Sequence, residues 1–156
     1  MKRLSRFLLQ ISVLMVLALS QSSRVSAASS SNHKDLFQTS DRCFACHNGL
    51  STSGGEDISI GLSWRPTMMA NSARDPYWQA GVRRETMDHP ESKSAIEDEC
   101  AVCHMPMARY QSKYEGKDAE VFARLVFGSD DRMDLLAQDG VSCSLCHQIT
   151  EDKLGT

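Results

Sequence analysis

The sequence predicts a mainly α-helical fold with long irregular segments, and three observations lead to this expectation. No stretch alternates apolar and polar residues with the period of two that a half-buried strand requires. Several stretches instead carry helix start and stop signals around apolar residues spaced three or four apart. Stretches rich in glycine and serine separate them and indicate loops.

The first 27 residues have the pattern of a secretory signal peptide. A basic segment precedes an apolar stretch over residues 7–19, and residues 25–27 (VSA) fit the small-x-small cleavage rule. The apolar stretch is shorter than the roughly 20 residues that a bilayer span needs. We therefore expect cleavage after Ala27, a periplasmic or otherwise exported protein, and no stable transmembrane segment after cleavage. An uncleaved membrane anchor is the alternative.

The mature chain would have 129 residues, enough for one modest domain, and would be acidic. The whole chain has 17 basic and 20 acidic residues, and cleavage removes four basic residues and no acidic one, which leaves a net charge of −7. Such a protein is not expected to bind nucleic acid or an anionic membrane surface. We expect a positively charged protein partner or simply a solvated surface. The four basic residues are Lys2, Arg3, Arg6 and Arg24.

We expect a flexible mature N-terminus over residues 28–39, because this stretch is largely polar and unpatterned. The first helix should begin near Ser40, an acceptable N-cap. Residues 48–61 (NGLSTSGGEDISIG) predict a loop, and a short helix should follow Pro66.

A longer helix is predicted to start at residues 75–76, with aspartate as the N-cap and proline at the first helical position. It should stop before Pro90, because the residue before a proline disfavours the helical conformation. Trp78, Val82 and His89 would then lie on one face of this helix.

The next helix should start at a capping box formed by Ser94 and Glu97 and end before Pro106. Residues 118–128 (DAEVFARLVFG) predict a helix with one apolar face, closed by the final glycine at the C′ position. One more short helix is expected over residues 129–140. The apolar face would consist of Val121, Phe122, Leu125 and Val126.

The motif C-x-x-C-H occurs at residues 43–47, 100–104 and 143–147, and the three copies use every cysteine of the chain. Three interpretations compete. An even cysteine count in an exported protein suggests disulfides, but disulfides need no histidine after each pair. Zinc uses C-x-x-C as a ligand pair, but three identical triads do not divide into four-ligand sites. The third interpretation is covalent attachment of c-type haem, of which C-x-x-C-H is the signature.

The chemistry of haem explains the spacing. Each haem carries two vinyl groups, and each cysteine sulfur adds to one of them as a thioether. On a helix, the first cysteine and the histidine share one face, so the imidazole can bind the iron while the sulfurs hold the rim. We therefore expect three covalently bound haems c in a domain over residues 40–156, forming much of its core. The attachment residues would be Cys43, Cys46, Cys100, Cys103, Cys143 and Cys146, and the proximal iron ligands His47, His104 and His147.

Around these motifs the chain resembles multihaem cytochromes c. The stretches SWRPTMMANSARDPYW (63–78), CAVCHMPM (100–107) and DGVSCSLCHQI (139–149) are similar to the branch that includes the tetrahaem electron carriers of hydroxylamine oxidation. The resemblance covers about residues 40–150. It implies an exported electron-transfer protein with closely stacked haems, whose partners are redox proteins, other multihaem cytochromes among them.

Members of this branch often carry a W-x-x-S-x-H-A segment whose histidine is a distal iron ligand. The matching residues here are Trp64, Thr67, Met69 and Ala70, so methionine stands where histidine would be. A fourth haem motif is absent, and the chain ends nine residues after His147. A fragment of a longer protein and a complete trihaem chain both remain open.

Three irons need up to three further ligands, whose identity largely sets the reduction potential. His33 and His89 are the two remaining histidines. We expect His89 to be a ligand because it ends a helix on its apolar face, although a helix-end cation near the C-terminal dipole is the alternative. His33 is a ligand or a solvated surface residue. Met69 is expected to ligate one iron, with packing against a haem face as the alternative, whereas Met105 and Met107 are expected to be packing residues.

Electron transfer between redox partners is the expected function, with no catalytic residue assigned. The alternative is a reductase, or part of one, acting on a small nitrogen or sulfur oxyanion at an open haem iron. Related nitrite reductases often replace the motif histidine by lysine, and the histidine in all three motifs here favours the carrier. A haem-based gas sensor is a third possibility. Side chains that could serve a substrate at an open iron are Tyr77, Arg83, Arg84 and Tyr110.

Overall fold

The computed structural model describes residues 34–152. The predicted signal peptide (1–27), the first part of the expected flexible N-terminus (28–33) and with it the candidate ligand His33 lie outside this range. Within it the chain is mainly helical, as predicted, and the only β-type contact is an isolated bridge in the loop after α2. The helices are α2 (Ser40–His47), α3 (Ile60–Trp64), α4 (Met68–Asn71), α5 (Pro76–Asp88), η1 (Pro90–Ser92), α6 (Lys93–His104), α7 (Pro106–Tyr114), α8 (Val121–Arg124), α9 (Arg132–Gln138) and α10 (Cys143–Cys146).

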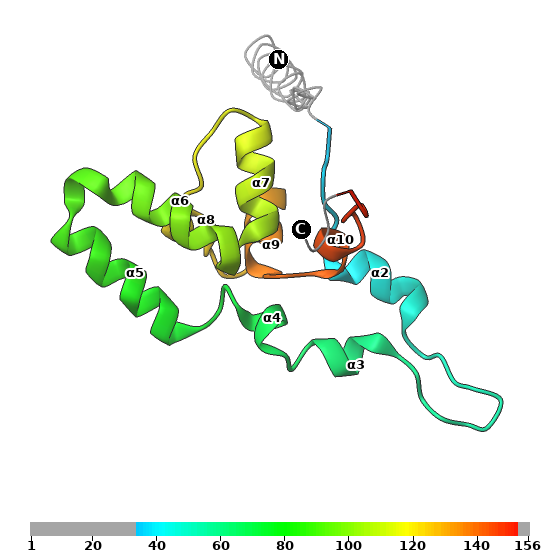
Figure 1. Ribbon diagram of the computed structural model, residues 1–156. Helices are drawn as coiled ribbons and strands as arrows, with labels where there is room; N and C mark the ends of the chain where they lie inside the picture. The colour runs from blue at the N-terminus through cyan, green and yellow to red at the C-terminus, as the bar shows by residue number, and fades with distance from the viewer. Residues whose placement is uncertain (1–33, 153–156) are drawn as a thin grey trace, which may run out of the picture. The chain divides into compact units, whose positions relative to one another are not determined.

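Helices α5 to α9 pack together around the apolar core (Figure 1). The short helix η1 joins α5 and α6 into a hairpin, α7 packs against α6 and α9, and α8 contacts the same two helices. The core is made of few and mostly small side chains, five of which are alanines. Its buried residues are Phe37, Ala73, Trp78, Val82, Ala101, Met105, Met107, Ala108, Ala119, Val121, Leu136 and Ala137.

Helices α2, α3 and α10 form a second group, in which α2 contacts both of the others. Two sets of hydrogen bonds between residues far apart in the sequence hold α2 beside α10. The backbone N–H and the hydroxyl of Ser40 donate to the carboxylate of Asp139 over 2.8 and 2.7 Å. Ser144 of α10 accepts from the N–H of Gln38 and donates to its carbonyl. The first and third motif helices therefore lie side by side.

The long helix after residue 75 is confirmed at both ends. Asp75 is its N-cap and accepts a hydrogen bond from the N–H of Tyr77 over 2.9 Å. Trp78 and Val82 are buried, as their shared face predicts. The placement of His89 on that face was wrong, because His89 follows the last helical residue with φ −129° and ψ 63° and its side chain is 58% exposed.

Two predicted helix caps were wrong, because their side chains form hydrogen bonds with residues far away in the sequence instead. Ser40 is the first residue of α2 rather than its N-cap, and its hydroxyl bonds Asp139. Ser94 lies inside α6, and Glu97 is buried and accepts a hydrogen bond from the N–H of Val121 over 2.7 Å. The capping box is therefore replaced by a contact that fixes the start of α8 against α6.

Two α-helices were not predicted, and one is shorter than expected. Helix α3 lies partly in the expected loop, and in α7 Pro106 starts a new helix at its first position, which proline tolerates well. Met105 and Met107 are 1% and 0% exposed, which confirms their packing role. Helix α8 ends at Arg124, so Val126 of the expected apolar face is exposed.

Residues 34–39 differ from the free segment expected there. Phe37 is buried in the core, and the N–H of Leu36 donates to the side chain of Gln111 over 2.9 Å. The segment is largely polar, but its two apolar residues, Leu36 and Phe37, pack in or against the core and hold it in place. No helix between residues 34 and 152 is long and apolar enough to cross a bilayer.

Candidate functional site

All three C-x-x-C-H motifs are helical in the same way. The first motif forms the second half of α2, and the second forms the last turn of α6. The third occupies α10, and His147 directly after it keeps the helical hydrogen bond, donating its N–H to the carbonyl of Cys143 over 3.0 Å. In each motif the first cysteine and the histidine therefore project from one face.

The motifs also share a pattern of exposure. In each one the first cysteine is half-buried and the second is exposed. No disulfide joins any two of the six cysteines in this structure, so the disulfide interpretation finds no pair here. The second sulfur of every motif is open to a group that approaches from solvent.

The first and third motifs face one cavity of about 690 Å³. This volume lies within the roughly 300–1,000 Å³ typical of cofactor and ligand sites. The packing of α2 against α10 brings together two triads that are 100 residues apart in the sequence. The cavity is lined by Gln38, Arg42, Cys43, Cys46, His47, Ile60, Cys143, Ser144, His147 and Gln148.

The first cysteines of these two motifs meet in the cavity. Burial raises the pKa of the Cys43 thiol, and the nearby Cys143, to which Cys43 is hydrogen-bonded, and the carboxylate of Asp139 raise it further. The pKa of Cys100 in the middle motif is raised by burial and then by the carboxylates of Glu85, Glu99 and Glu97. Both shifts favour the protonated thiol over the thiolate.

The middle motif has a different environment, in which His104 is held by three contacts. Its Nδ1 lies 3.0 Å from the carbonyl oxygen of Ser72. The hydroxyl of Ser72 donates to the carbonyl of His104 over 2.9 Å. The indole of Trp78 stacks on the imidazole, with ring centroids 4.3 Å apart and planes 7° from parallel. Trp78 is buried, and its Nε1–H has no hydrogen-bond acceptor among residues 34–152.

The candidate ligand Met69 lies on α4 with its side chain half exposed. Its carbonyl accepts a hydrogen bond from the N–H of Val141 over 3.0 Å. Val141 lies two residues before the third motif, so this bond fixes the backbone of Met69 against the start of that motif. The neighbouring Met68 is more exposed, at 74% against 51%. The backbone contact places Met69 next to the segment that leads into the third motif, and its role as a ligand stays a prediction.

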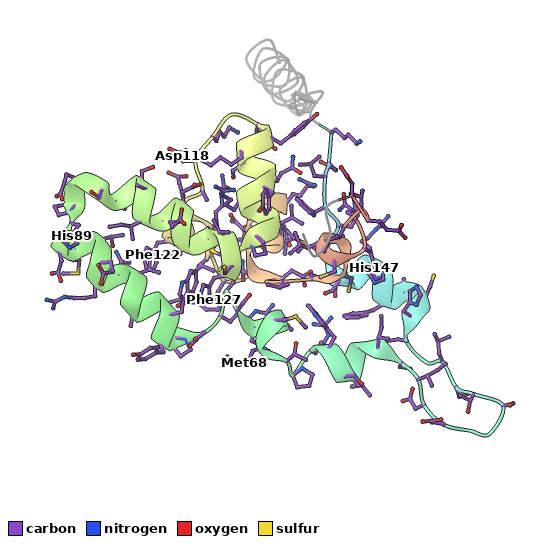
Figure 2. The ribbon with its side chains drawn as sticks, in the orientation of Figure 1. Met68, His89, Asp118, Phe122, Phe127 and His147 are labelled. Atoms are coloured by element: carbon purple, nitrogen blue, oxygen red, sulfur yellow. The ribbon has the colours of Figure 1, made fainter. Side chains whose placement is uncertain are left out.

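The candidate ligand His89 is separated from the motif histidines. It lies at the turn between α5 and α6, far from His147 (Figure 2). Helix α6 alone separates that turn from His104 by about 16 Å at 1.5 Å per residue. The Nδ1 of His89 is 3.9 Å from the carboxylate of Glu91, an exposed pair. His89 therefore lies at a helix end and not beside the middle motif, and its role as an iron ligand stays a prediction.

The side chains considered for a substrate do not line the cavity between the first and third motifs. Tyr77 is 88% exposed, Arg84 pairs with Asp88 on α5, and the guanidinium of Arg83 lies 4.1 Å from the ring centre of Phe122. They act as surface or packing groups in this arrangement.

Sequence reasoning missed the partners of the motifs. Ser72 and Trp78 lie 26 to 32 residues from His104, and Asp139 lies 99 residues from Ser40, so no local spacing connects them. For Trp78 the sequence did offer a signal, because its place on the predicted apolar face of α5 indicated that it packs against another helix.

Comparisons with protein-family models, with curated proteins and with solved structures found no match. Among residues 34–152, no group of three or more histidine, cysteine, aspartate and glutamate side chains is clustered in a way that could hold a metal ion.

Proposed function

We propose that this chain is an exported multihaem c-type cytochrome that transfers electrons between redox partners through three covalently bound haems. One observation carries the proposal. Three C-x-x-C-H triads that use all six cysteines share one helical geometry, with the first cysteine and the histidine on a common face and the second cysteine exposed.

The residues fit the group that they would hold. Each triad offers two cysteine sulfurs, one for each vinyl group of a haem, and none of them is used in a disulfide. One histidine per triad provides an imidazole nitrogen for the iron. When bound, the haem iron supplies a centre that accepts and releases one electron. The family resemblance of residues 40–150 and the predicted signal peptide support export and electron transfer.

The shared cavity indicates which cofactors would be neighbours. Because Cys43 and Cys143 are hydrogen-bonded, the first and third haems would be attached at adjacent points, although their motifs are the most distant in the sequence. The middle haem would be attached at the end of α6, linked to the third motif through the segment from Met69 to Ser72. Electrons would then pass between neighbouring haems in an order that differs from the order of the motifs.

Intact mass tests the proposal. The mature protein, purified from an exported fraction and denatured, should exceed the mass of the polypeptide by three haems. A double substitution of Cys100 and Cys103 by alanine should remove one haem, and the matched substitution of Cys143 and Cys146 should remove another. Free thiols at Cys43, Cys100 or Cys143 in the wild-type protein, or a mass without haem, would contradict the proposal.

A further inference from the structure

His104 is the only motif histidine whose ring is held by other residues of the described chain. Its Nδ1 is hydrogen-bonded to Ser72 and its face is covered by Trp78. His47 and His147 are exposed and have no side-chain hydrogen bond to residues 34–152. The middle motif is therefore built differently from the other two, although the three sequences follow one pattern.

The contact with Ser72 selects the tautomer of His104. A carbonyl oxygen only accepts hydrogen bonds, so Nδ1 must carry the hydrogen. In the neutral ring the lone pair then lies on Nε2, and this is the nitrogen that a metal ion would meet. A carbonyl acceptor at the Nδ1–H also raises the basicity of Nε2 as a ligand.

The contact with Trp78 fixes the plane of the ring. The two rings are nearly parallel, and Trp78 is 9% exposed within the α5–α6 interface. Ser72 is anchored in turn, because its hydroxyl donates to the carbonyl of His104. Rotation of the imidazole about its Cβ–Cγ bond would break the hydrogen bond at Nδ1 and the stacking at the same time.

We propose that Ser72 and Trp78 are positioning residues that hold His104 in one tautomer and one ring plane, with Nε2 free to bind iron. This inference rests on the proposed function and deepens it for the middle haem. The stronger imidazole donor stabilises the ferric state, so the potential of the middle haem is lower than it would be without these two residues.

Potentiometric titration of the holoprotein tests the proposal with three variants and one control. In Trp78→Leu the stacking is lost, and one of the three potentials should rise. A change of about tenfold in its reduction equilibrium constant corresponds to about 59 mV for one electron. Trp78→Phe retains an aromatic ring and should give a smaller rise. Ser72→Ala loses the hydroxyl contact and should also raise one potential.

The control is Trp64→Phe, which changes the other tryptophan of the chain. Trp64 packs at a tilt against Phe44, with ring centroids 5.7 Å apart, whereas the ring stacked on His104 is that of Trp78. Trp64→Phe should leave the potential of the middle haem unchanged. A purely structural role of Trp78 would lower the melting temperature of the variants without moving a potential.

The intact mass of every sample shows whether a negative result concerns the proposed function or only the positioning role of Ser72 and Trp78. If the wild-type protein carries no haem, the proposed function fails. If the variants carry three haems and their potentials equal those of the wild type, the positioning role is overturned. An equal shift in Trp78→Leu and Trp78→Phe would contradict the stacking role, because phenylalanine keeps a ring in that place. Should Trp78→Leu not accumulate, Ser72→Ala and Trp78→Phe carry the test.

Discussion

His47, His104 and His147 follow the same spacing after their cysteines, but their surroundings differ. His104 is half-buried between Ser72 and Trp78, whereas the other two are exposed beside the cavity that their motifs share. The motif alone predicts these histidines as proximal ligands, since the motif is a local pattern. The environment of each imidazole depends on residues far away in the sequence, and under the proposed function that environment would tune the iron.

Met69 offers a test of the distal ligands. A thioether is a weaker donor than imidazole and favours ferrous iron, so the haem that it ligates should have the highest potential. Met69→Ala should abolish the near-infrared sulfur-to-iron charge-transfer band and lower one potential, with little effect on the other two haems. Near-infrared absorption and potentiometric titration measure both effects.

Met68→Ala is the matched control for this substitution, because Met68 is adjacent and more exposed. It should leave the charge-transfer band in place. A wild-type protein without the band, or a band that survives Met69→Ala, would show that Met69 packs against a haem or faces solvent.

Helices α6 and α7 are joined by a charged cluster around Asp98. Its side chain is 14% exposed and lies 3.1 Å from Arg109 and 3.2 Å from Lys113, and it accepts a hydrogen bond from the N–H of Ala119. Burial raises the pKa of Asp98, but the hydrogen bonds from Arg109, Ala119 and Lys113 outweigh it and hold the pKa below its usual range. The cluster ties α7 and the segment before α8 to α6.

Acid should weaken this junction. Because the pKa of Asp98 is depressed in the folded state, its contribution is fully present above the unfolded value of about 3.9 and is lost as the pH falls through the folded pKa. Asp98→Asn should lower the free energy of unfolding by about 2 kcal/mol at pH 7, the typical range for hydrogen bonds to a charged group. Chemical denaturation from pH 7 to pH 3 should show that the variant loses less stability below about pH 4 than the wild type.

Glu56→Gln is the control for charge removal, because Glu56 is an exposed loop residue. It should change the unfolding free energy by less than about 0.5 kcal/mol. If the difference between wild type and Asp98→Asn stays constant down to pH 3, the contribution of the cluster does not depend on ionised Asp98.

The relative positions of the three motifs depend on contacts between distant parts of the described chain. The first and third face one cavity, and the segment from Met69 to Ser72 connects the middle motif to the third. Gly140 is the close-packed point of this connection. Its φ is +65°, and a Cβ there would lie 2.6 Å from the carbonyl oxygen of Met69 and 2.8 Å from the hydroxyl of Ser72.

Gly140→Ala should therefore disrupt the connection. The substitution combines the left-handed conformation with a clash against backbone, whereas Gly116→Ala has φ +74° and open space around the new methyl group. We expect Gly140→Ala to cost about 1–3 kcal/mol more than Gly116→Ala in the free energy of unfolding. Denaturant titration of both variants measures this difference, and equal costs would show that α4 yields at this contact.

Export is predicted from the signal-peptide pattern of residues 1–27 and can be tested directly. N-terminal sequencing of protein from the periplasmic fraction should begin at Ala28, since residues 25–27 form the predicted cleavage site. A protein that keeps Met1 and sediments with membranes would identify the segment as an anchor.

The sequence by itself determined the features that depend on local pattern. These are the mainly helical fold and the start of α5 at residues 75–76, and the prediction of haem attachment at three C-x-x-C-H triads also rests on local pattern. Each follows from residues within one or two helical turns, where spacing and capping preferences act directly. The capping box at Ser94 and Glu97 failed for the opposite reason, because distant residues compete for the same side chains.

Only the tertiary structure decided which motifs are neighbours and how each histidine is held. The hydrogen bond between Cys43 and Cys143 requires α2 to pack on α10. The orientation of His104 requires contacts with Ser72, which precedes α5, and with Trp78, which lies in α5. Such contacts close loops of up to 100 residues and depend on how the helices bury their faces. A local sequence pattern does not specify them, since the same triad occurs in all three environments.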